Sequence, residues 1–490
     1  MSPSALARLS PGLYAAPDPL PMRRTKIIAT LGPATVDGSV LGGLIAAGAD
    51  ACRLNFSHGT AEEHAAACRA VRSQAHAMGR QILVLQDLAG PKIRTGRLSE
   101  PVILLAGSEV VIDLGDEEGG PGRITSPFAP LFSSVAPGQR LLLDDGRLEL
   151  TVTRVEPGRL VTSVVEGGVL ESRKGITAPG AVVQTSALTP KDHVDLKAGV
   201  AMGVDAVALS FVQSPEDVVR ARAAAAAAGA ADMPIIAKIE RPSAVDHIDA
   251  IVAVSDGIMI ARGDLGIEMP LERVPAVQRR ILLAARRRGV PVIVATEVLE
   301  SMRLSSRPTR AEVTDATHAV DEGADAIMLS GETAVGRHPV RVVATLAAIV
   351  EQAERDMALA GGHGGIPVAP DAVIASRHGL ALCEAAVALA HRAGATAIVA
   401  VTKKGMTPRL LAALRPAARI IAATPNVQTA ARLALVWGVT PMLTPAATLP
   451  AVREMLLAHA LVPAGDTIVF VAMHAALGRE ADNFLVVERM

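Results

Sequence analysis

Cysteine and aromatic residues are scarce in this chain of 490 residues. It has three cysteines (Cys52, Cys68 and Cys383), one tryptophan, one tyrosine and six phenylalanines. Three cysteines cannot build a disulfide framework, which indicates a reducing compartment. Because aromatic residues make up only 2% of the chain, few rings are available to stack on nucleic-acid bases. The composition therefore argues against a disulfide scaffold and against a nucleic-acid-binding protein.

An excess of charge and long apolar runs are also missing. Lys and Arg total 48 against 49 Asp and Glu, so no net charge favours nucleic acid. No run approaches the roughly 20 uninterrupted apolar residues that a membrane span needs. Residues 1–22 are rich in proline and do not resemble a signal sequence, so we expect a loose N-terminal extension there. The sequence predicts a soluble, cytoplasmic protein.

Short apolar segments that alternate with helices dominate the rest of the chain. Such segments, rich in Val or Ile, occupy residues 25–32, 50–56, 82–88, 205–211, 234–240, 257–262, 291–297 and 325–331. They are apolar on both faces, as strands of a covered parallel sheet are. Helical stretches such as 214–229 and 272–288 separate most of them. Eight strands in this pattern predict an α/β fold with a (β/α)₈ barrel.

The interval between the third and fourth strands is too long for an uninterrupted barrel. Residues 92–188 carry short Val/Leu/Thr runs broken by Gly and Pro, which predicts an inserted antiparallel β-barrel domain that could close over the barrel mouth as a lid. The catalytic barrel is then assigned to residues 23–91 and 189–355. After a Gly-rich joint at 360–367, alternating strands and helices predict a C-terminal α/β domain over 368–490.

Polar side chains gather at the C-terminal ends of the predicted barrel strands, where barrel enzymes carry their catalytic groups. They are Arg53, Asn55, Ser57, Asp87, Lys92, Arg94, Lys238, Glu240, Arg262, Asp264, Thr296, Glu297, Ser330 and Glu332. Lys238 and Glu240 share a face because side chains alternate along a strand. A structural salt bridge would explain one such pair. Polar groups at nearly every strand end indicate instead one convergent site.

The residue types in this cluster indicate a divalent cation beside an anionic substrate. Glu240 and Asp264 are hard oxygen donors suited to Mg²⁺ or Mn²⁺. Arg53, Arg94 and Lys238 are cations suited to phosphate or carboxylate. A metal next to such cations favours phosphoryl transfer or enolate stabilisation, because both reactions develop negative charge on oxygen atoms.

Eight segments, in order over residues 24–350, resemble pyruvate kinases. They read TKIIATLGPAT, CRLNFSHG, LQDLAGPKIRTG, IIAKIE, MIARGDLGIE, ATEVLESM, PTRAEVTD and IMLSGETAVGRHP. The resemblance implies transfer of the phosphoryl group of phosphoenolpyruvate to ADP in glycolysis, through a metal-stabilised enolate, by an ATP-binding homotetramer that uses Mg²⁺ or Mn²⁺. Two alternatives stay open: another Mg²⁺-dependent phosphoenolpyruvate- or pyruvate-handling barrel enzyme (an aldolase or lyase), and a catalytically silent metabolite-binding paralogue.

The resemblance also implies roles for individual residues. Lys238 would stabilise the transferring phosphoryl group and the enolate oxygen, and Arg53 would bind the phosphate. The backbone N–H groups of Gly263 and Asp264, with the Thr296 hydroxyl, would bind the substrate carboxylate. Thr296 would also help to relay a proton to the enolate carbon. The two carboxylates named above would be the protein ligands of the metal.

The nucleotide positions implied by the resemblance are Asn55, His58, Arg94 and Lys174. Lys174 lies in the predicted lid, where residues 177–180 read Thr-Ala-Pro-Gly in place of the family's usual Asn-Leu-Pro-Gly. Contacts from the lid are therefore the part of the site that departs most from the family pattern.

A monovalent-cation position is implied at Asn55, Ser57, Asp87 and the carbonyl of Leu88. Potassium-dependent family members carry Glu where this chain has Lys92, in the block GPKIRTG. An ammonium group can supply electrostatically what K⁺ supplies, so we predict that K⁺ is not required. The alternative is that Lys92 turns into solvent or only pairs with Asp87.

A candidate effector loop lies in TKKGMTPRL (402–410), between a strand and a helix, where backbone N–H groups can hold a phosphate. Its residues are Thr402, Lys403, Lys404, Gly405 and Thr407. The loop keeps only part of the family's Ser-Gly-x-Ser/Thr pattern, and residues 473–483 replace the usual Gly-rich loop of the fructose bisphosphate site. The prediction is a smaller phosphorylated effector or none, with an empty structural loop as the alternative.

Overall fold

The computed structural model describes residues 23–181, 183, 185–360, 377–445, 448–473 and 483–490. The predicted N-terminal extension, nearly all of the 360–367 joint, the first residues of the 368–490 domain and most of the 473–483 segment lie outside the described residues. Within the described ranges, no helix combines the length and the apolar character needed to cross a membrane.

Eight parallel strands close into a barrel, as predicted. The strands are β1 (Lys26–Thr30), β2 (Ala51–Asn55), β3 (Leu83–Asp87), β12 (Ala206–Leu209), β13 (Ile235–Ile239), β14 (Gly257–Ala261), β15 (Val292–Ala295) and β16 (Ala326–Leu329). Each strand pairs with the next, and β16 pairs with β1. Nearly every strand residue is buried because helices cover the outside and side chains fill the inside. The α/β barrel class predicted from the strand pattern is therefore confirmed.

Helices surround the barrel and connect its strands. They are α1 (Gly38–Ala46), α2 (Ala61–Ala77), α4 (Pro190–Met202), α5 (Pro215–Ala227), α6 (Pro242–Asp246), α7 (Ile248–Val254), α8 (Arg262–Glu268), α9 (Val274–Arg287), α10 (Arg310–Asp321), α11 (Gly331–Ala334) and α12 (Pro339–Leu359). Several begin at a Thr whose hydroxyl accepts a backbone N–H in a reciprocal capping box, as Thr60 does for α2.

The region inserted between β3 and α4 forms its own β structure. It contains β4 (Val102–Leu104), β5 (Glu109–Leu114), β6 (Arg123–Ser126), α3 (Ala129–Ser134), β7 (Arg140–Leu143), β8 (Leu148–Glu156), β9 (Arg159–Glu166), β10 (Gly168–Leu170) and β11 (Ile176–Thr177). A six-stranded sheet in the order β11-β7-β8-β9-β5-β6 faces a separate apolar core. Whereas the sequence pattern predicted antiparallel pairing throughout, β5 and β6 run parallel, so the sheet is mixed.

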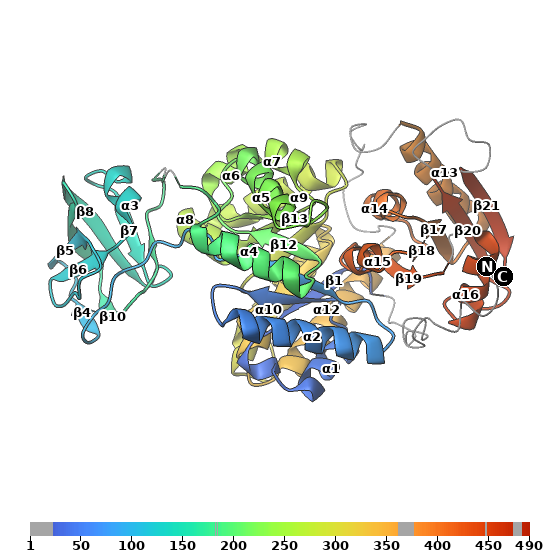
Figure 1. Cartoon of the computed structure of the whole chain (residues 1–490), viewed down its shortest axis with the longest axis horizontal. Coiled ribbons are helices and arrows are strands. Elements are labelled where there is room, and N and C mark those ends of the chain that lie inside the picture. Colours follow the sequence, from blue (N-terminus) through green and yellow to red (C-terminus); the bar gives the residue numbers. More distant parts are fainter. Residues whose placement is uncertain (1–22, 182, 184, 361–376, 446–447, 474–482) are drawn as a thin grey trace.

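The C-terminal region is a second α/β unit. It contains α13 (Arg377–Ala393), β17 (Ala397–Val401), α14 (Met406–Ala413), β18 (Arg419–Thr424), α15 (Val427–Leu433), β19 (Val439–Leu443), α16 (Leu449–Ala458), β20 (Thr467–Ala472) and β21 (Phe484–Arg489). The sheet order is β19-β18-β17-β20-β21, with β21 antiparallel. Figure 1 shows the inserted region (β4 to β11) at one end, the barrel in the middle and this C-terminal unit at the other end. The exact domain boundaries given above remain predictions.

Candidate active site

Asp87, at the C-terminal end of β3, joins a cation on the adjacent strand β2 to a cation on β13, which is two strands away on the other side. Its Oδ2 lies 2.6 Å from Nε of Arg53 on β2, and its Oδ1 lies 3.1 Å from Nζ of Lys238 on β13. Arg53 also donates to the Thr30 hydroxyl, at 3.2 Å. Burial disfavours a charge on Asp87, but Lys238 and Arg53 outweigh it and hold the pKa of this carboxyl below its ordinary value. The three side chains therefore form a charged, buried unit.

Lys238 has partners from three directions. Besides Asp87, its Nζ contacts Oε1 of Glu240 at 2.9 Å and donates to Oγ of Ser210 at 2.7 Å. Burial alone would lower the pKa of Lys238, but the Asp87 and Glu240 carboxylates raise it above the ordinary lysine value. Lys238 is thus a fixed positive charge at neutral pH, held with its ammonium among three oxygen atoms.

Glu240 and Asp264 bring two carboxylates to the same corner of the mouth. Glu240 is buried, and its Oε2 accepts the Phe211 N–H at 2.7 Å. Asp264 lies in the first turn of α8, directly after β14. Burial, and then the nearby charge of Glu240, raise the pKa of Asp264 to about 6. A divalent cation bound to both carboxylates would offset the repulsion that Glu240 exerts on the charged form of Asp264.

The protein offers few ligands for such a cation. In the described part of the chain, no group of three or more His, Cys, Asp or Glu side chains is arranged to hold a metal. A cation at Glu240 and Asp264 would therefore need further oxygen atoms from substrate or water, which suits Mg²⁺ with substrate phosphates.

Thr296 follows β15 in a strained conformation. Its φ is 68°, and that of Glu297 is 54°, in the left-handed region that β-branched residues rarely adopt. The Thr296 hydroxyl accepts the Gly263 N–H at 2.7 Å and donates to the Ala295 carbonyl at 2.6 Å. The guanidinium of Arg262 donates to the Thr296 carbonyl at 3.0 Å. The turn is thus held in place from α8, and the Thr296 hydroxyl lies beside Gly263.

A cavity of about 380 Å³ lies between the barrel mouth and the region inserted between β3 and α4. Of the predicted site residues, it is lined by His58, Lys92, Arg94, Lys174 and Asp264. Three of the four proposed nucleotide positions are thereby brought together with a metal-ligand candidate. Lys174 contacts carboxylates of its own region, and its ion pairs with Asp144 and Glu171 are both 3.0 Å long.

The fourth nucleotide position, Asn55, does not line this cavity. Its Oδ1 accepts the Ser57 N–H at 3.1 Å, which closes a turn after β2. On the next strand, the carbonyl of Leu88 accepts the Ser210 hydroxyl at 2.7 Å. Of the groups proposed for a monovalent cation, the Asn55 side-chain oxygen and the Leu88 carbonyl therefore accept local hydrogen bonds, and the Asp87 oxygens bind Arg53 and Lys238.

The Lys92 side chain is open to solvent, yet it lies in the concave wall of the cavity. Neighbouring atoms still crowd its ammonium, and this burial, followed by the charge of Lys238, lowers its pKa. No ion pair joins Lys92 to Asp87 within the described structure, because Arg53 and Lys238 occupy both oxygens of that carboxylate. The electrostatic neighbours of Lys92 are instead Lys238, Asp264 and Glu240.

The candidate effector loop is held by one internal hydrogen bond and by one from α15. The Thr402 hydroxyl accepts the Gly405 N–H at 2.9 Å, and the Lys403 carbonyl accepts the Thr429 hydroxyl at 3.0 Å. Thr407, in the first turn of α14, is 3% exposed. Only Lys403 and Lys404 of the five proposed residues are exposed to solvent.

The residue Ser210 and the contacts of Arg262 escaped the sequence analysis. Ser210 donates to Leu88 and accepts from Lys238, and Arg262 fixes the Thr296 turn while pairing with Asp315 at 2.7 Å. Ser210 comes directly after β12, a barrel strand whose C-terminal end carries no charged residue. A search of strand ends for hydroxyls as well as charges would have found it.

Comparison with known proteins gives a consistent result. Residues 22–343 match the family model "Pyruvate kinase, barrel domain", and residues 380–487 match "Pyruvate kinase, alpha/beta domain". The chain is 44% identical over 428 residues to a pyruvate kinase of Methylorubrum extorquens, covering 86% of this chain and 87% of the relative. It is 42% identical over 456 residues to a pyruvate kinase of Mycobacterium intracellulare, covering 92% and 95%.

Proposed function

The chain belongs to the pyruvate kinase family, and from this premise we propose that it transfers the phosphoryl group of phosphoenolpyruvate to ADP, giving pyruvate and ATP in glycolysis. The observation that carries the proposal is the buried Lys238, fixed by Asp87 and Glu240 next to Asp264. A preorganised positive charge of this kind stabilises charge that develops on oxygen during the reaction.

The phosphoenolpyruvate would lie across the strand ends. Arg53 would bind its phosphate with the guanidinium nitrogens that Asp87 leaves free to turn toward substrate. The substrate carboxylate would accept the N–H groups of Gly263 and Asp264, of which the first is donated to Thr296 in this structure. Lys238 would then face both the transferring phosphoryl group and the enolate oxygen.

The donor set at Glu240 and Asp264 fits Mg²⁺ or Mn²⁺, because both ligands are carboxylates that lie close enough for the charge of Glu240 to raise the pKa of the buried Asp264. A bound cation would neutralise charge on the substrate carboxylate and phosphate. The protein would hold it with these two side chains alone.

Proton delivery is assigned to Thr296. Its strained backbone, bound by Arg262, fixes the hydroxyl beside Gly263, where the substrate carboxylate would lie. A hydroxyl that both accepts and donates can pass a proton toward the enolate carbon. The ADP would occupy the cavity under the lid region, against His58, Arg94 and Lys174, with Asn55 at its edge.

Assembly and location are inferred from the family alone. We propose a homotetramer in the cytoplasm, and a lid over residues 92–188 that closes on the nucleotide. For the loop at Thr402 and Thr407, we propose a phosphorylated effector smaller than fructose 1,6-bisphosphate, or none. Activation by that bisphosphate that is lost in Thr407→Ala would contradict the proposal for the loop.

The two alternatives differ from this function in one assay. With phosphoenolpyruvate, Mg²⁺ and ADP, the purified protein should form pyruvate, and removal of ADP should abolish the product. A lyase or aldolase would not depend on the nucleotide. A silent paralogue would form no pyruvate at any Mg²⁺ or effector concentration.

Potassium independence would distinguish this protein from the potassium-dependent family members that carry Glu at the position of Lys92. We expect nearly full activity in assays buffered with Tris or tetramethylammonium, because the Lys92 ammonium lies among Lys238, Asp264 and Glu240, where it can replace K⁺. Lys92→Glu should depress activity and make it recoverable by added K⁺. Lys197→Glu, which changes the charge of a lysine of α4, is the control. A wild-type enzyme that is nearly inactive without K⁺ would show that Lys92 is not the built-in cation.

A further inference from the structure

Four aspartates occupy equivalent positions at the base of the barrel, opposite the mouth. Each aspartate directly precedes the second, fourth, sixth or eighth strand of the barrel, which are β2, β12, β14 and β16. Its N–H donates to the carbonyl of a residue at the start of the preceding barrel strand, at 2.9 Å in all four cases. Its carboxylate in turn accepts that residue's N–H, at 2.7–3.0 Å. The four pairs are Asp50 with Ile27, Asp205 with Val84, Asp256 with Ile235, and Asp325 with Val292. We call each pair an Asp clasp.

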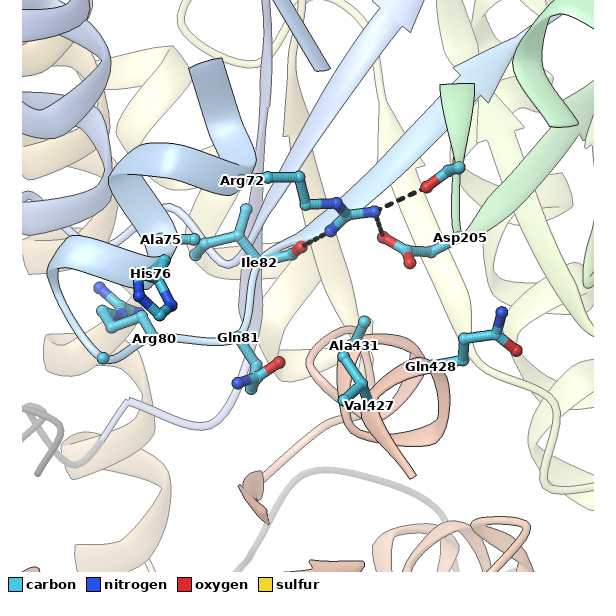
Figure 2. Close-up of a pocket in the computed structure, with 12 residues that line it drawn as sticks. Arg72, Ala75, His76, Arg80, Gln81, Ile82, Asp205, Val427, Gln428 and Ala431 are labelled. Atoms are coloured by element: carbon cyan, nitrogen blue, oxygen red, sulfur yellow. Dashed lines mark hydrogen bonds and ion pairs between the residues drawn. The ribbon is translucent and has the colours of Figure 1, made fainter. Parts of the chain in front are cut away.

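Each Asp clasp is completed by an arginine that makes two contacts of the same kind. The guanidinium donates to the carboxylate and to the carbonyl two residues before the aspartate. At the second clasp, Arg72 of α2 donates to Asp205 at 2.7 Å and to Gly203 at 2.9 Å (Figure 2). At the first and third clasps, Arg23 and Arg222 bind in the same way. These three arginines all belong to the barrel.

The fourth Asp clasp takes its arginine from the C-terminal region. Arg415 lies 3.0 Å from Asp325 and donates to the Gly323 carbonyl at 2.8 Å, which repeats the contacts of Arg72. Arg415 comes two residues after the end of α14. The C-terminal region thus supplies the arginine of one clasp, whereas the barrel supplies the arginines of the other three.

The backbone conformation of Arg415 would suit glycine better, which indicates that the contacts of the arginine side chain offset the strain. Its φ is 49°, in the left-handed region that glycine prefers after a helix. A non-glycine residue held there stores strain that the surrounding structure must offset. Its guanidinium lies over the ring of Trp437 at 4.4 Å, and its Nε and Nη1 make no hydrogen bond among the described residues. The stacked ring replaces those missing partners in part.

Further contacts surround the fourth clasp. Leu435 packs in the same apolar cluster as the residues that fill the barrel interior, so it closes the base of the barrel. Lys26 of β1 donates through Nζ to the Val439 carbonyl at 2.8 Å. At the second clasp the fit is looser: a cavity of about 310 Å³ separates Arg72 and its neighbours from α15, as Figure 2 shows. Among the described residues, the hydrogen bonds between the C-terminal region and the barrel therefore gather around the fourth clasp, where Arg24 also donates to the Pro416 carbonyl at 3.0 Å.

We propose that Arg415 is a positioning residue through which the C-terminal region sets the two barrel strands that carry part of the active site. Asp325 fixes the start of β16 and, through Val292, the start of β15. Each of these strands is four residues long, and β15 leads directly into Thr296. The catalytic part of this inference rests on the proposed function, and the docking part does not.

Trp437 provides the test, because it is the only tryptophan of the chain and is 5% exposed. In Arg415→Met, we expect its emission to shift to the red and its quenching by acrylamide to rise severalfold. We also expect kcat to fall roughly tenfold with a smaller change in KM, as displaced catalytic groups produce. Arg415→Lys, which keeps the charge but loses the planar stack, should give intermediate values.

The matched control is Arg222→Met, which opens the third clasp inside the barrel. It should lower the melting temperature and leave the Trp437 emission unchanged. If Arg415→Met does not fold, Asp325→Asn removes the ion pair and keeps an oxygen for the Val292 N–H. If the Trp437 emission is unchanged in the Arg415 and Asp325 variants, or shifts equally in Arg222→Met, Arg415 does not dock the C-terminal region on the barrel. If the emission shifts and kcat does not fall, Arg415 does not position the strands of the active site. Absence of activity in the wild type would refute the proposed function alone.

Discussion

Replacing Lys238 with methionine is expected to lower kcat by roughly two to three orders of magnitude while the KM for phosphoenolpyruvate changes little. The reason is that the charge opposite Lys238 develops mainly in the transition state, so the ground-state complex loses less. Removal of one preorganised donor typically costs roughly 3–4 kcal/mol, and each 1.4 kcal/mol is about a factor of ten in rate.

The measurement is steady-state kinetics on the variant with thermal unfolding to verify the fold. Methionine leaves Asp87 and Glu240 without their shared ammonium, so some loss of stability is expected as well. Lys191→Met, which removes an exposed lysine of α4, is the control for loss of a cation. A raised KM with unchanged kcat would assign Lys238 to substrate binding and contradict its role in the reaction.

Removal of either proposed metal ligand should shift the Mg²⁺ requirement strongly. Loss of an outer-shell partner alone typically lowers metal affinity roughly 10–100-fold, so Asp264→Asn should raise the half-saturating Mg²⁺ at least that much. Glu240→Gln should do the same, although Glu240 also contacts Lys238, which mixes two effects. Asp264→Asn is therefore the cleaner variant, and Mn²⁺ binding measured by titration calorimetry gives a readout independent of turnover.

Glu268→Gln is the matched control for the metal experiment. Glu268 lies on the same helix as Asp264 and lines the same cavity, and burial raises its pKa to about 7. Its replacement should leave the metal titration unchanged if the cation is held by Glu240 and Asp264. Identical titration curves for wild type, Asp264→Asn and Glu240→Gln would move the metal site elsewhere.

Much of the fold was predictable because the barrel strands are short, apolar on both faces and separated by helices. Strand β19 has a weak sequence signal, because its sequence VTPML contains Thr440 and Pro441; it lies at the edge of its sheet, where proline is tolerated. The parallel pairing of β5 with β6 could not be predicted, because pairing direction depends on the path of the chain between the strands.

The position of the site was predictable from the strand ends, but its internal contacts were not. Asp87 on β3 meets Arg53 on the adjacent β2 and Lys238 on β13, two strands away on the other side, because the closed barrel brings these strand ends together at its mouth. The strain at Thr296 has no signature in its residue type. The Asp clasps were missed for another reason: the Gly-x-Asp-Ala repeat that precedes three of the four strands, at residues 48–51, 203–206 and 323–326, lies at the end opposite the catalytic groups.

The stoichiometry of product formation tests the central claim most directly. The wild-type protein is stripped of divalent cations with EDTA, supplied with phosphoenolpyruvate and ADP, and titrated with MgCl₂ while pyruvate and ATP are both quantified. Because Glu240 and Asp264 crowd two carboxylates at the mouth beside the fixed charge of Lys238, we predict no product before Mg²⁺ is added. Equal amounts of pyruvate and ATP should then appear. Pyruvate without ATP, or neither product at any Mg²⁺ concentration, would contradict the account.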